Sequence, residues 1–329
     1  MVYPIILARS ENTRSWDSWD SDGNEYIDFT MGNGSCIFGH SPEWLTTAIG
    51  QSLRSGTETG PQSQIAGKLA KAICELTAME RATFFNNEAE AMMIAIKLAR
   101  NVTRRERIAS FTAGHHGAVG LSLLPGDDCM VLDYKDAAAL EILIAHAPEL
   151  AAVVVKPGPQ PHEFLQTVRE TTASSGTALI LDEAATGFRC APGDTQANFG
   201  IHADMATYSN VIAGGMPLGI LAGRKNHMDA LDGGDERSSK AMTHFPTGIF
   251  RSHPLALAAA MRVVEHLMEE GPRLQIEMQE RVAKVCRTLN EYLEKIGIAI
   301  RLSHFSSDAV IECAGELKYS SLPWFFPRA

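Results

Sequence analysis

No run of about 18 consecutive apolar residues, the length that a membrane-spanning helix needs, occurs in this chain of 329 residues. The richest apolar stretch, residues 137–155, is interrupted by Glu141, His146, Pro148 and Glu149. Residues 1–9 also lack the basic segment with which a signal peptide begins. These absences favour a protein that neither crosses a membrane nor is exported.

Cysteine and positive charge are both scarce. The six cysteines are scattered and form no C-x-x-C pair, a pattern that favours a reduced, cytoplasmic protein over a disulfide scaffold or a zinc site. Lysine and arginine number 29 against 39 acidic residues, and the net charge of −10 argues against nucleic acid or an anionic membrane as the main partner. The 45% hydrophobic and 21% charged content is that of an ordinary globular protein.

Strand-like and helix-like segments alternate along the first two thirds of the chain. The predicted strands cover residues 81–85, 108–111, 129–132, 151–156 and 178–182, and the predicted helices cover residues 63–76, 88–101, 137–145 and 163–174. This alternation predicts an α/β fold with a mostly parallel sheet covered on both faces. Two long amphipathic helices, residues 255–270 and 273–296, follow a change of character near Pro254. We therefore predict an N-terminal segment (1–60), a large domain (61–253) and a small C-terminal domain (254–329).

Ligands of such sheets bind beyond the carboxyl ends of the strands. Four segments directly follow predicted strands and carry polar or glycine residues: 86–88, 114–117, 156–158 and 182–183. We expect a functional site to be built from these segments.

Several long motifs at these strand ends resemble class III aminotransferases, which are pyridoxal phosphate (PLP) enzymes of fold type I. The resemblance rests on residues 179–189 (LILDEAATGFR), 204–219 (DMATYSNVIAGGMPLG), 22–28, 111–117 and 252–256. Within the class, the chain is most similar to glutamate-1-semialdehyde-aminomutase-like proteins. It is closer still to the aminotransferase domains of hybrid polyketide–nonribosomal peptide synthases. The resemblance implies a PLP fold type I architecture, a small C-terminal domain that is shorter than in the family, and a role in natural-product or other small-molecule metabolism.

The resemblance also implies a homodimer with shared active sites. The segments that match the family's dimer contact are Trp16, Trp19, residues 36–38 and residues 245–250.

The lysine that holds PLP as a Schiff base in the family corresponds here to Asn210. An amide cannot form an imine and has no useful basicity. The family's phosphate cradle, Asn-Ser-Gly-Thr-Glu-Ala, reads Asn-Asn-Glu-Ala-Glu-Ala at residues 86–91, so Asn86 and Asn87 precede a carboxylate, Glu88, where the phosphate is expected. Like charges at contact distance repel strongly.

Three further positions depart from the family, and one is kept. The aromatic residue that stacks on the pyridine ring corresponds to His115, and the threonine that caps the phosphate corresponds to Ile249. The family's Glu-Pro pair appears here as Lys156 followed by proline. Asp182, the partner of the pyridine nitrogen, remains. These departures predict a degenerate PLP site with no cofactor, and PLP or its amine form, pyridoxamine phosphate (PMP), is the alternative.

We therefore expect acid–base catalysis by Asp182, His115, Glu88 and Lys156 on a keto or carrier-tethered acyl substrate, small or bound to a carrier protein. For each residue a structural role is also open: Asp182 as a relic, Glu88 as a favourable first-turn charge, and Lys156 as the partner of a buried carboxylate. The spacing of the candidate residues matches no known metal pattern, and no metal is predicted. Two rival functions remain: a non-catalytic homologue that binds or stabilises a partner, and a PLP-dependent transaminase whose lysine was mutated or relocated to Lys156.

Overall fold

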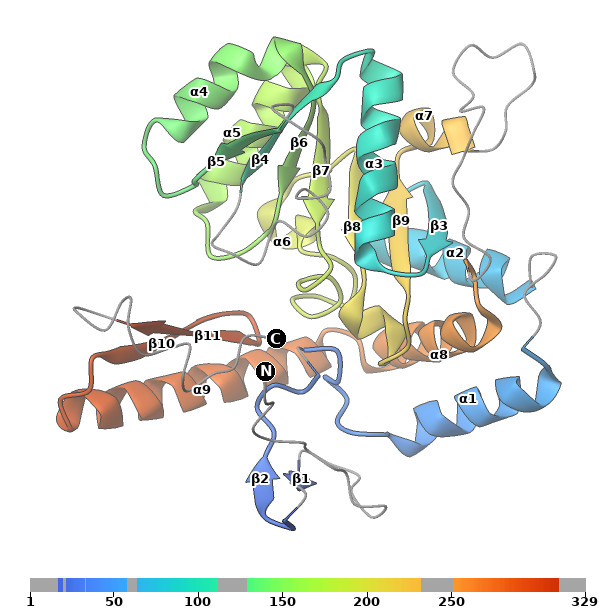
Figure 1. Ribbon diagram of the computed structural model, residues 1–329, viewed down its shortest axis with the longest axis vertical. Helices are drawn as coiled ribbons and strands as arrows, with labels where there is room; N and C mark the ends of the chain where they lie inside the picture. Colours follow the sequence, from blue (N-terminus) through green and yellow to red (C-terminus); the bar gives the residue numbers. More distant parts are fainter. Residues whose placement is uncertain are drawn as a thin grey trace.

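The computed structural model describes residues 17–19, 22–32, 34–57, 64–111, 129–231 and 251–313. At its centre lies a seven-stranded sheet (Figure 1). From edge to edge the order is β3 (Arg81–Phe85), β9 (Gly219–Gly223), β8 (Met205–Tyr208), β7 (Ala178–Asp182), β6 (Leu150–Val155), β4 (Arg107–Phe111) and β5 (Cys129–Leu132). β9 is antiparallel to both of its neighbours, and every other neighbouring pair is parallel. The predicted α/β fold with a mostly parallel sheet is therefore confirmed.

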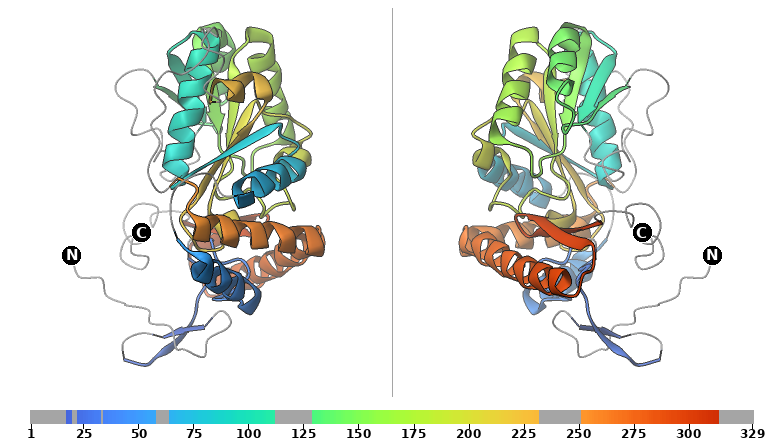
Figure 2. Two further views of the ribbon diagram at one scale, coloured as in Figure 1. Left: turned by 90° about the vertical axis from the view of Figure 1, so that its right-hand side faces the viewer. Right: turned by 90° about the vertical axis from the view of Figure 1, so that its left-hand side faces the viewer.

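Helices cover both faces of the sheet (Figure 2). One face is covered by α3 (Glu88–Thr103) and α7 (Lys225–Met228), and the other by α2 (Gln64–Thr77), α4 (Ala139–His146) and α5 (His162–Ser175). Side chains of the buried strands alternate between the two faces: in β7, Ile180 packs with α3, whereas Leu179 and Leu181 pack with α2 and α5. This alternation decides which face each polar residue at a strand end meets.

The remaining elements lie at one end of the sheet (Figure 1). α1 (Glu43–Ser55) packs on α8 (Pro254–Glu270), and α9 (Arg273–Lys295) packs on the antiparallel pair β10 (Ile300–Phe305) and β11 (Asp308–Cys313). Short pieces complete the described chain: β1 (Asp17–Trp19), β2 (Glu25–Ile27) and α6 (Gln196–Phe199).

One buried arginine joins three parts of the chain. Arg189 follows β7; its Nε donates to the Ala185 carbonyl at 3.1 Å, and its guanidinium donates to the Gly34 carbonyl of the N-terminal segment. Its Nη1 also donates to Ser307 Oγ, 3.4 Å away in the turn between β10 and β11. Because the side chain is only 7% exposed, these bonds hold the loop after β7 in a fixed place between the two ends of the chain.

The bounds of β3, β5 and β7 agree with the predicted strands, and the other predicted helices and strands end within one or two residues of the observed ones. The limits of the three proposed domains stay a prediction. In the described ranges, no helix combines the length and the apolar character needed to span a bilayer.

Candidate functional site

Asp182 is the last residue of β7 and is 7% exposed. Strand alternation places it on the same face as Ile180, which is the face that α3 covers. The Ala184 N–H donates to Asp182 Oδ1 at 3.3 Å, so the chain turns sharply after the strand and supports the carboxylate. A buried carboxylate therefore stands at the carboxyl edge of a central strand.

Lys156 stands beside Asp182 at the same edge. β6 and β7 are parallel neighbours in which Val155 pairs with Leu181. The residues that come next, Lys156 after β6 and Asp182 in β7, therefore lie side by side. Val154 packs with α3. Lys156 follows two residues later, so strand alternation places it on the same face of the sheet. Its backbone carbonyl accepts a hydrogen bond from Gln160 Nε2 at 2.8 Å, which closes the loop that follows β6.

The start of α3 is fixed by reciprocal hydrogen bonds. The Glu90 N–H donates to the N-cap side chain, Asn87 Oδ1, at 2.9 Å, and the Asn86 N–H, one residue before the N-cap, donates to Glu90 Oε2 at 3.0 Å. β9 packs closely against this start, because a Cβ added to Gly219 would lie 2.0 Å from the Asn87 carbonyl oxygen. Asn86 and Asn87 therefore hold the helix, which places Glu88, its first residue, toward the sheet edge.

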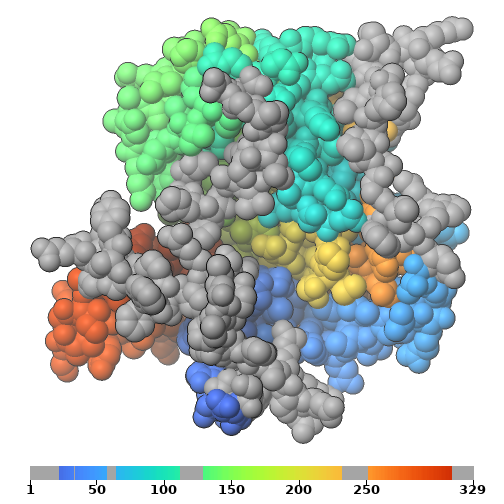
Figure 3. Space-filling model, viewed as in Figure 1, coloured from blue at the N-terminus to red at the C-terminus, as the bar shows by residue number. Residues whose placement is uncertain are grey.

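In the space-filling view, the lower end of α3 borders the segment between β8 and β9, with α1 below (Figure 3). Within the described residues, no hydrogen bond is formed by the backbone N–H of Glu88 or of Ala89. Such first-turn N–H groups, together with the helix dipole, favour an anion.

Glu88 and Asp182 are near enough for each carboxyl to influence the pKa of the other. Burial and the negative charge of Asp182 raise the pKa of Glu88 to about 7, although the Lys156 ammonium acts in the opposite direction. Burial likewise raises the pKa of Asp182, against the charge of Lys156 and the Ala184 N–H. Burial therefore disfavours ionisation of both carboxyls at once.

Lys156 attracts this pair without touching it. Among the ion pairs of the described residues, no nitrogen–oxygen distance of 4.0 Å or less joins Lys156 to Glu88 or Asp182. With one proton on the carboxyl pair, the three side chains together are neutral, which is the arrangement that burial favours.

A second group of buried acids lies on the opposite face and was not found from the sequence. Glu183 is fully buried, and its Oε2 accepts the Thr195 N–H at 2.8 Å; nearby, the Tyr208 hydroxyl donates to Asp194 Oδ2 at 3.2 Å. Burial and the neighbouring Asp194 raise the pKa of Glu183 to about 8. The signal was the pair of adjacent acids 182–183 at a strand end, since strand alternation sends neighbours to opposite faces.

Three other predicted positions are less defined. His115 and Ile249 lie outside the described residues. Asn210 follows β8 at the start of a short 3-10 helix (Asn210–Ala213), is half-buried and has a φ of 43°. Asparagine is one of the few residues that adopt positive φ readily. Within the described chain no hydrogen bond joins its side chain to Asp182 or Lys156.

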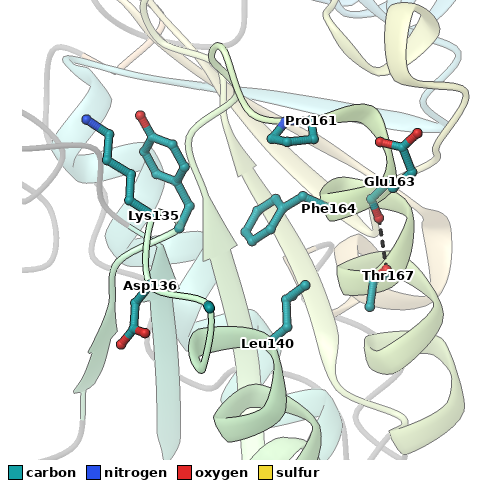
Figure 4. A pocket seen from close by; sticks show the side chains of 9 residues that line it. Lys135, Asp136, Leu140, Pro161, Glu163, Phe164 and Thr167 are labelled. Atoms are coloured by element: carbon teal, nitrogen blue, oxygen red, sulfur yellow. Dashed lines mark hydrogen bonds between the residues drawn. The ribbon is translucent and has the colours of Figure 1, made fainter.

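A pocket of about 300 Å³ lies elsewhere, where α4 and α5 begin (Figure 4). Phe164 and Leu140 point into it, and Lys135 and Glu163 stand at its rim. Its lining is mainly apolar and includes none of the candidate site residues. The candidate site residues thus lie at the strand ends around Asp182 and not in this pocket.

Comparison with known proteins agrees with the mostly parallel sheet and with the buried aspartate at the end of a central strand. The family model for class-III aminotransferases matches residues 2–131 and 127–301, and the chain belongs to this family. A particular relative is the glutamate-1-semialdehyde 2,1-aminomutase of Aquifex aeolicus (strain VF5). It is 31% identical over 90% of this chain and 74% of its own length.

Two solved structures extend the comparison. A structure described as a transaminase with PLP bound superimposes with a TM-score of 0.84 and 25% identity, and covers 95% of this chain and 78% of that one. A glutamate-1-semialdehyde-aminomutase from Pseudomonas aeruginosa PAO1, in a lysine-to-alanine variant in complex with PMP, has a TM-score of 0.80 and 20% identity. It covers 94% of this chain and 74% of that one.

These findings correct one prediction. The departures in the sequence led us to expect no cofactor, and this expectation is wrong, because the family and its solved members are proteins of PLP and PMP. Replaced side chains leave the N–H groups of the backbone in place. A buried carboxylate and two first-turn N–H groups without a partner in the described chain fit a ring nitrogen and a phosphate. The side chains that correspond to the family's lysine, aromatic residue and threonine remain Asn210, His115 and Ile249.

Proposed function

We propose that this class-III aminotransferase-like chain binds PLP or PMP non-covalently at the carboxyl end of β7, beside the start of α3. The observation that carries the proposal is the buried carboxylate of Asp182, facing a capped helix whose first N–H groups have no acceptor in the described chain. Asp182 would hold the ring nitrogen, and the N–H groups of Glu88 and Ala89 would hold the phosphate. Asn210 supports non-covalent binding, because an amide cannot take the place of the lysine.

When bound, a cofactor of this class supplies an electron sink for chemistry next to an amine or carbonyl. The residues of the chain supply the proton transfers. Glu88, with its pKa raised to about 7 by burial and by Asp182, is poised to give or take a proton at neutral pH. Lys156 keeps the site neutral when Asp182 is ionised.

The substrate that fits this proposal is a small molecule with a keto or amino group, free or tethered to a carrier. The named activity of the Aquifex relative, an aminomutase of a semialdehyde, supports this class. Participation in polyketide or nonribosomal peptide biosynthesis rests on the resemblance of residues 151–305 and stays a prediction, as does a cytoplasmic location.

A homodimer is part of the same proposal. Of the segments that match the family's dimer contact, the structure describes the side chains of residues 36–38, which are half-buried. Ile37 and Phe38 pack against the core with one side and remain partly open on the other, as residues at an interface do.

One observation favours a second candidate, a homologue that binds a ligand or partner without turnover. Asn210 removes the amine that shuttles protons in the family, and among the described residues only Lys156 offers another amine beside Asp182. A transaminase with its lysine relocated to Lys156 is the third candidate.

Equilibrium dialysis of the purified protein against PMP tests the proposal. PMP is the suitable probe because, having no aldehyde, it does not react with surface lysines. We expect saturable binding of one PMP per chain, and absence of binding would overturn the proposal. Treatment with PLP and borohydride followed by peptide mass spectrometry separates the candidates, since only a relocated lysine would label Lys156.

A further inference from the structure

Among the described residues, Arg189 is the one lysine or arginine that is buried, with 7% of the residue exposed. None of the ion pairs formed within this part of the chain includes it. The partly buried Arg169, by contrast, lies 2.9 Å from the carboxylate of Asp204. A guanidinium stays protonated in proteins, so a positive charge is buried here with no carboxylate against it, which is costly unless an anion balances the charge.

Uncharged oxygens take only some of the donors of this guanidinium. Nε donates to the Ala185 carbonyl at 3.1 Å, Nη2 donates to the Gly34 carbonyl, and Nη1 donates to Ser307 Oγ at 3.4 Å. A Cβ on Gly34 would collide with Nη2, so glycine leaves the room that the guanidinium needs. Because each terminal nitrogen carries two N–H groups, one N–H of Nη1 and one of Nη2 have no acceptor in the described chain.

The guanidinium is held most loosely on the side of the turn between β10 and β11. Its bond to Ser307, in that turn, is longer than its bonds to the two carbonyls, and Asp308, the next residue, is exposed to solvent. Burial lowers the pKa of Arg189 and the charge of Asp308 acts in the opposite direction, although the two side chains form no ion pair. Burial also raises the pKa of the neighbouring Cys190 thiol to about 12, which leaves Asp308 as the negative group that influences Arg189 at neutral pH.

One turn of the chain places both this cation and Asp182. The Ala184 N–H donates to Asp182 Oδ1 at 3.3 Å, and the carbonyl of the next residue, Ala185, accepts the bond from Arg189 Nε. The residue that supports the buried carboxylate and the residue that orients the buried guanidinium are therefore neighbours in the loop after β7.

We propose that Arg189 binds the carboxylate of a small substrate whose reacting group is presented to the cofactor held at Asp182. The inference rests on the proposed function and names the substrate class, a keto or amino acid with a free carboxylate. The two oxygens of a carboxylate accept the two remaining N–H groups at once, and the planar guanidinium matches that geometry. The bound carboxylate supplies the counter-charge, and none of the bonds that hold Arg189 in the chain has to break.

Titration of the purified protein with pyruvate, followed by ligand-detected NMR, tests the inference. Pyruvamide is the matched probe, because it keeps the keto group and the size of pyruvate but lacks the charge. We expect saturable binding of pyruvate and at least about tenfold weaker binding of pyruvamide, which is the value of a charge-assisted contact. Equal affinities for the two probes would overturn the inference.

A pair of arginine variants separates ligand binding from loss of stability. Arg105 is half-buried and also bonds only uncharged oxygens, the carbonyls of Leu150 and Ser175 and the hydroxyl of Thr177, but it lies at the amino ends of β6 and β7. Arg189→Met should bind pyruvate about tenfold more weakly, whereas the matched control Arg105→Met should keep the natural affinity. Arg189→Lys, which keeps the charge without the planar fork, should fall between them. An equal loss in both methionine variants would show that Arg189 acts only through stability.

An exposed position keeps the test open if Arg189→Met does not fold. Asp308→Asn removes the negative charge that competes with a bound carboxylate, so pyruvate should bind about threefold more tightly and pyruvamide should be unaffected. Unchanged or weaker binding of pyruvate by this variant would contradict the inference. Dialysis against PMP, run on the same proteins, keeps the two proposals apart: PMP binding without a preference for pyruvate leaves the proposed function and removes the role of Arg189, and absence of PMP binding removes the proposed function.

Discussion

Asp182 and Glu183 are adjacent in sequence but belong to two different environments. Asp182 turns to the α3 face, where it meets Glu88 and Lys156 at the edge of the sheet. Glu183 turns to the opposite face, where it is fully buried near Asp194 and Tyr208. Both carboxyls are desolvated, and burial raises the pKa of both.

The difference lies in the partners. Glu183 accepts a backbone N–H from Thr195 and has no route to solvent, so its contacts fix the loop that follows β7. Asp182 lies at the end of its strand, where the neighbouring groups that influence its pKa are Lys156 and the half-buried Glu88. The same side-chain chemistry thus stabilises the fold on one face and serves ligand binding on the other.

The largest expected effect is on the free energy of unfolding. Glu183→Ala leaves the Thr195 N–H without its acceptor and opens a cavity, and we expect a loss of about 3 kcal/mol. Asp182→Asn keeps the shape of the side chain and should cost less than about 1 kcal/mol. Urea denaturation of both variants measures the two values, and equal losses would remove the distinction between the two faces.

The pH dependence of stability should show the same contrast. The pKa of Glu183 in the folded chain, about 8, lies above its ordinary value of 4.5, so the folded state binds a proton that the unfolded state has lost. This contribution is complete below pH 4.5 and disappears as the pH rises to 8. Glu183→Gln should therefore lose about 3 kcal/mol less than the natural chain between pH 5.5 and 8, as measured by urea denaturation at the two pH values. A parallel loss in both proteins would contradict a protonated Glu183.

Ligand affinity should depend on the other face. In Asp182→Asn the side chain no longer carries a charge to hold a ring nitrogen, so PMP should bind about tenfold more weakly. Its melting temperature should remain near that of the natural chain. Calorimetric titration with PMP gives the affinity, and Glu163→Gln, an exposed acid on α5, serves as the control. An unchanged Kd in Asp182→Asn would place the ligand elsewhere.

The smallest effect concerns Lys156. Its positive charge lowers the pKa of Glu88 against burial, so Lys156→Met should move the Glu88 titration upward by about half a pH unit. The carboxyl resonances in NMR report the shift. A downward movement would mean that Lys156 does not face the pair.

Much of this arrangement could be predicted from the sequence. The strand-like segments of the sequence predicted the bounds of β3, β5 and β7. The rule that ligands bind at strand ends then pointed to Asp182, Lys156 and Glu88 as candidate site residues. The antiparallel β9 and the helix α1 were not identified, because short apolar segments and amphipathic surface helices give weak signals.

That Glu88, Asp182 and Lys156 come near one another was predicted from their places at a helix start and two strand ends, but the burial that raises the pKa of Glu88 depends on packing that the sequence does not show. The cofactor prediction was wrong for a related reason. The amino-acid sequence shows which side chains differ from those of the family. The N–H groups at the start of α3 belong to the backbone and are present whatever the side chains are.

A crystal structure of the natural chain soaked with PMP tests the central claim most directly. We predict PMP in contact with Asp182 and with the first turn of α3, and no covalent bond to any lysine. PMP bound at another place, or joined covalently to a lysine, would contradict the account.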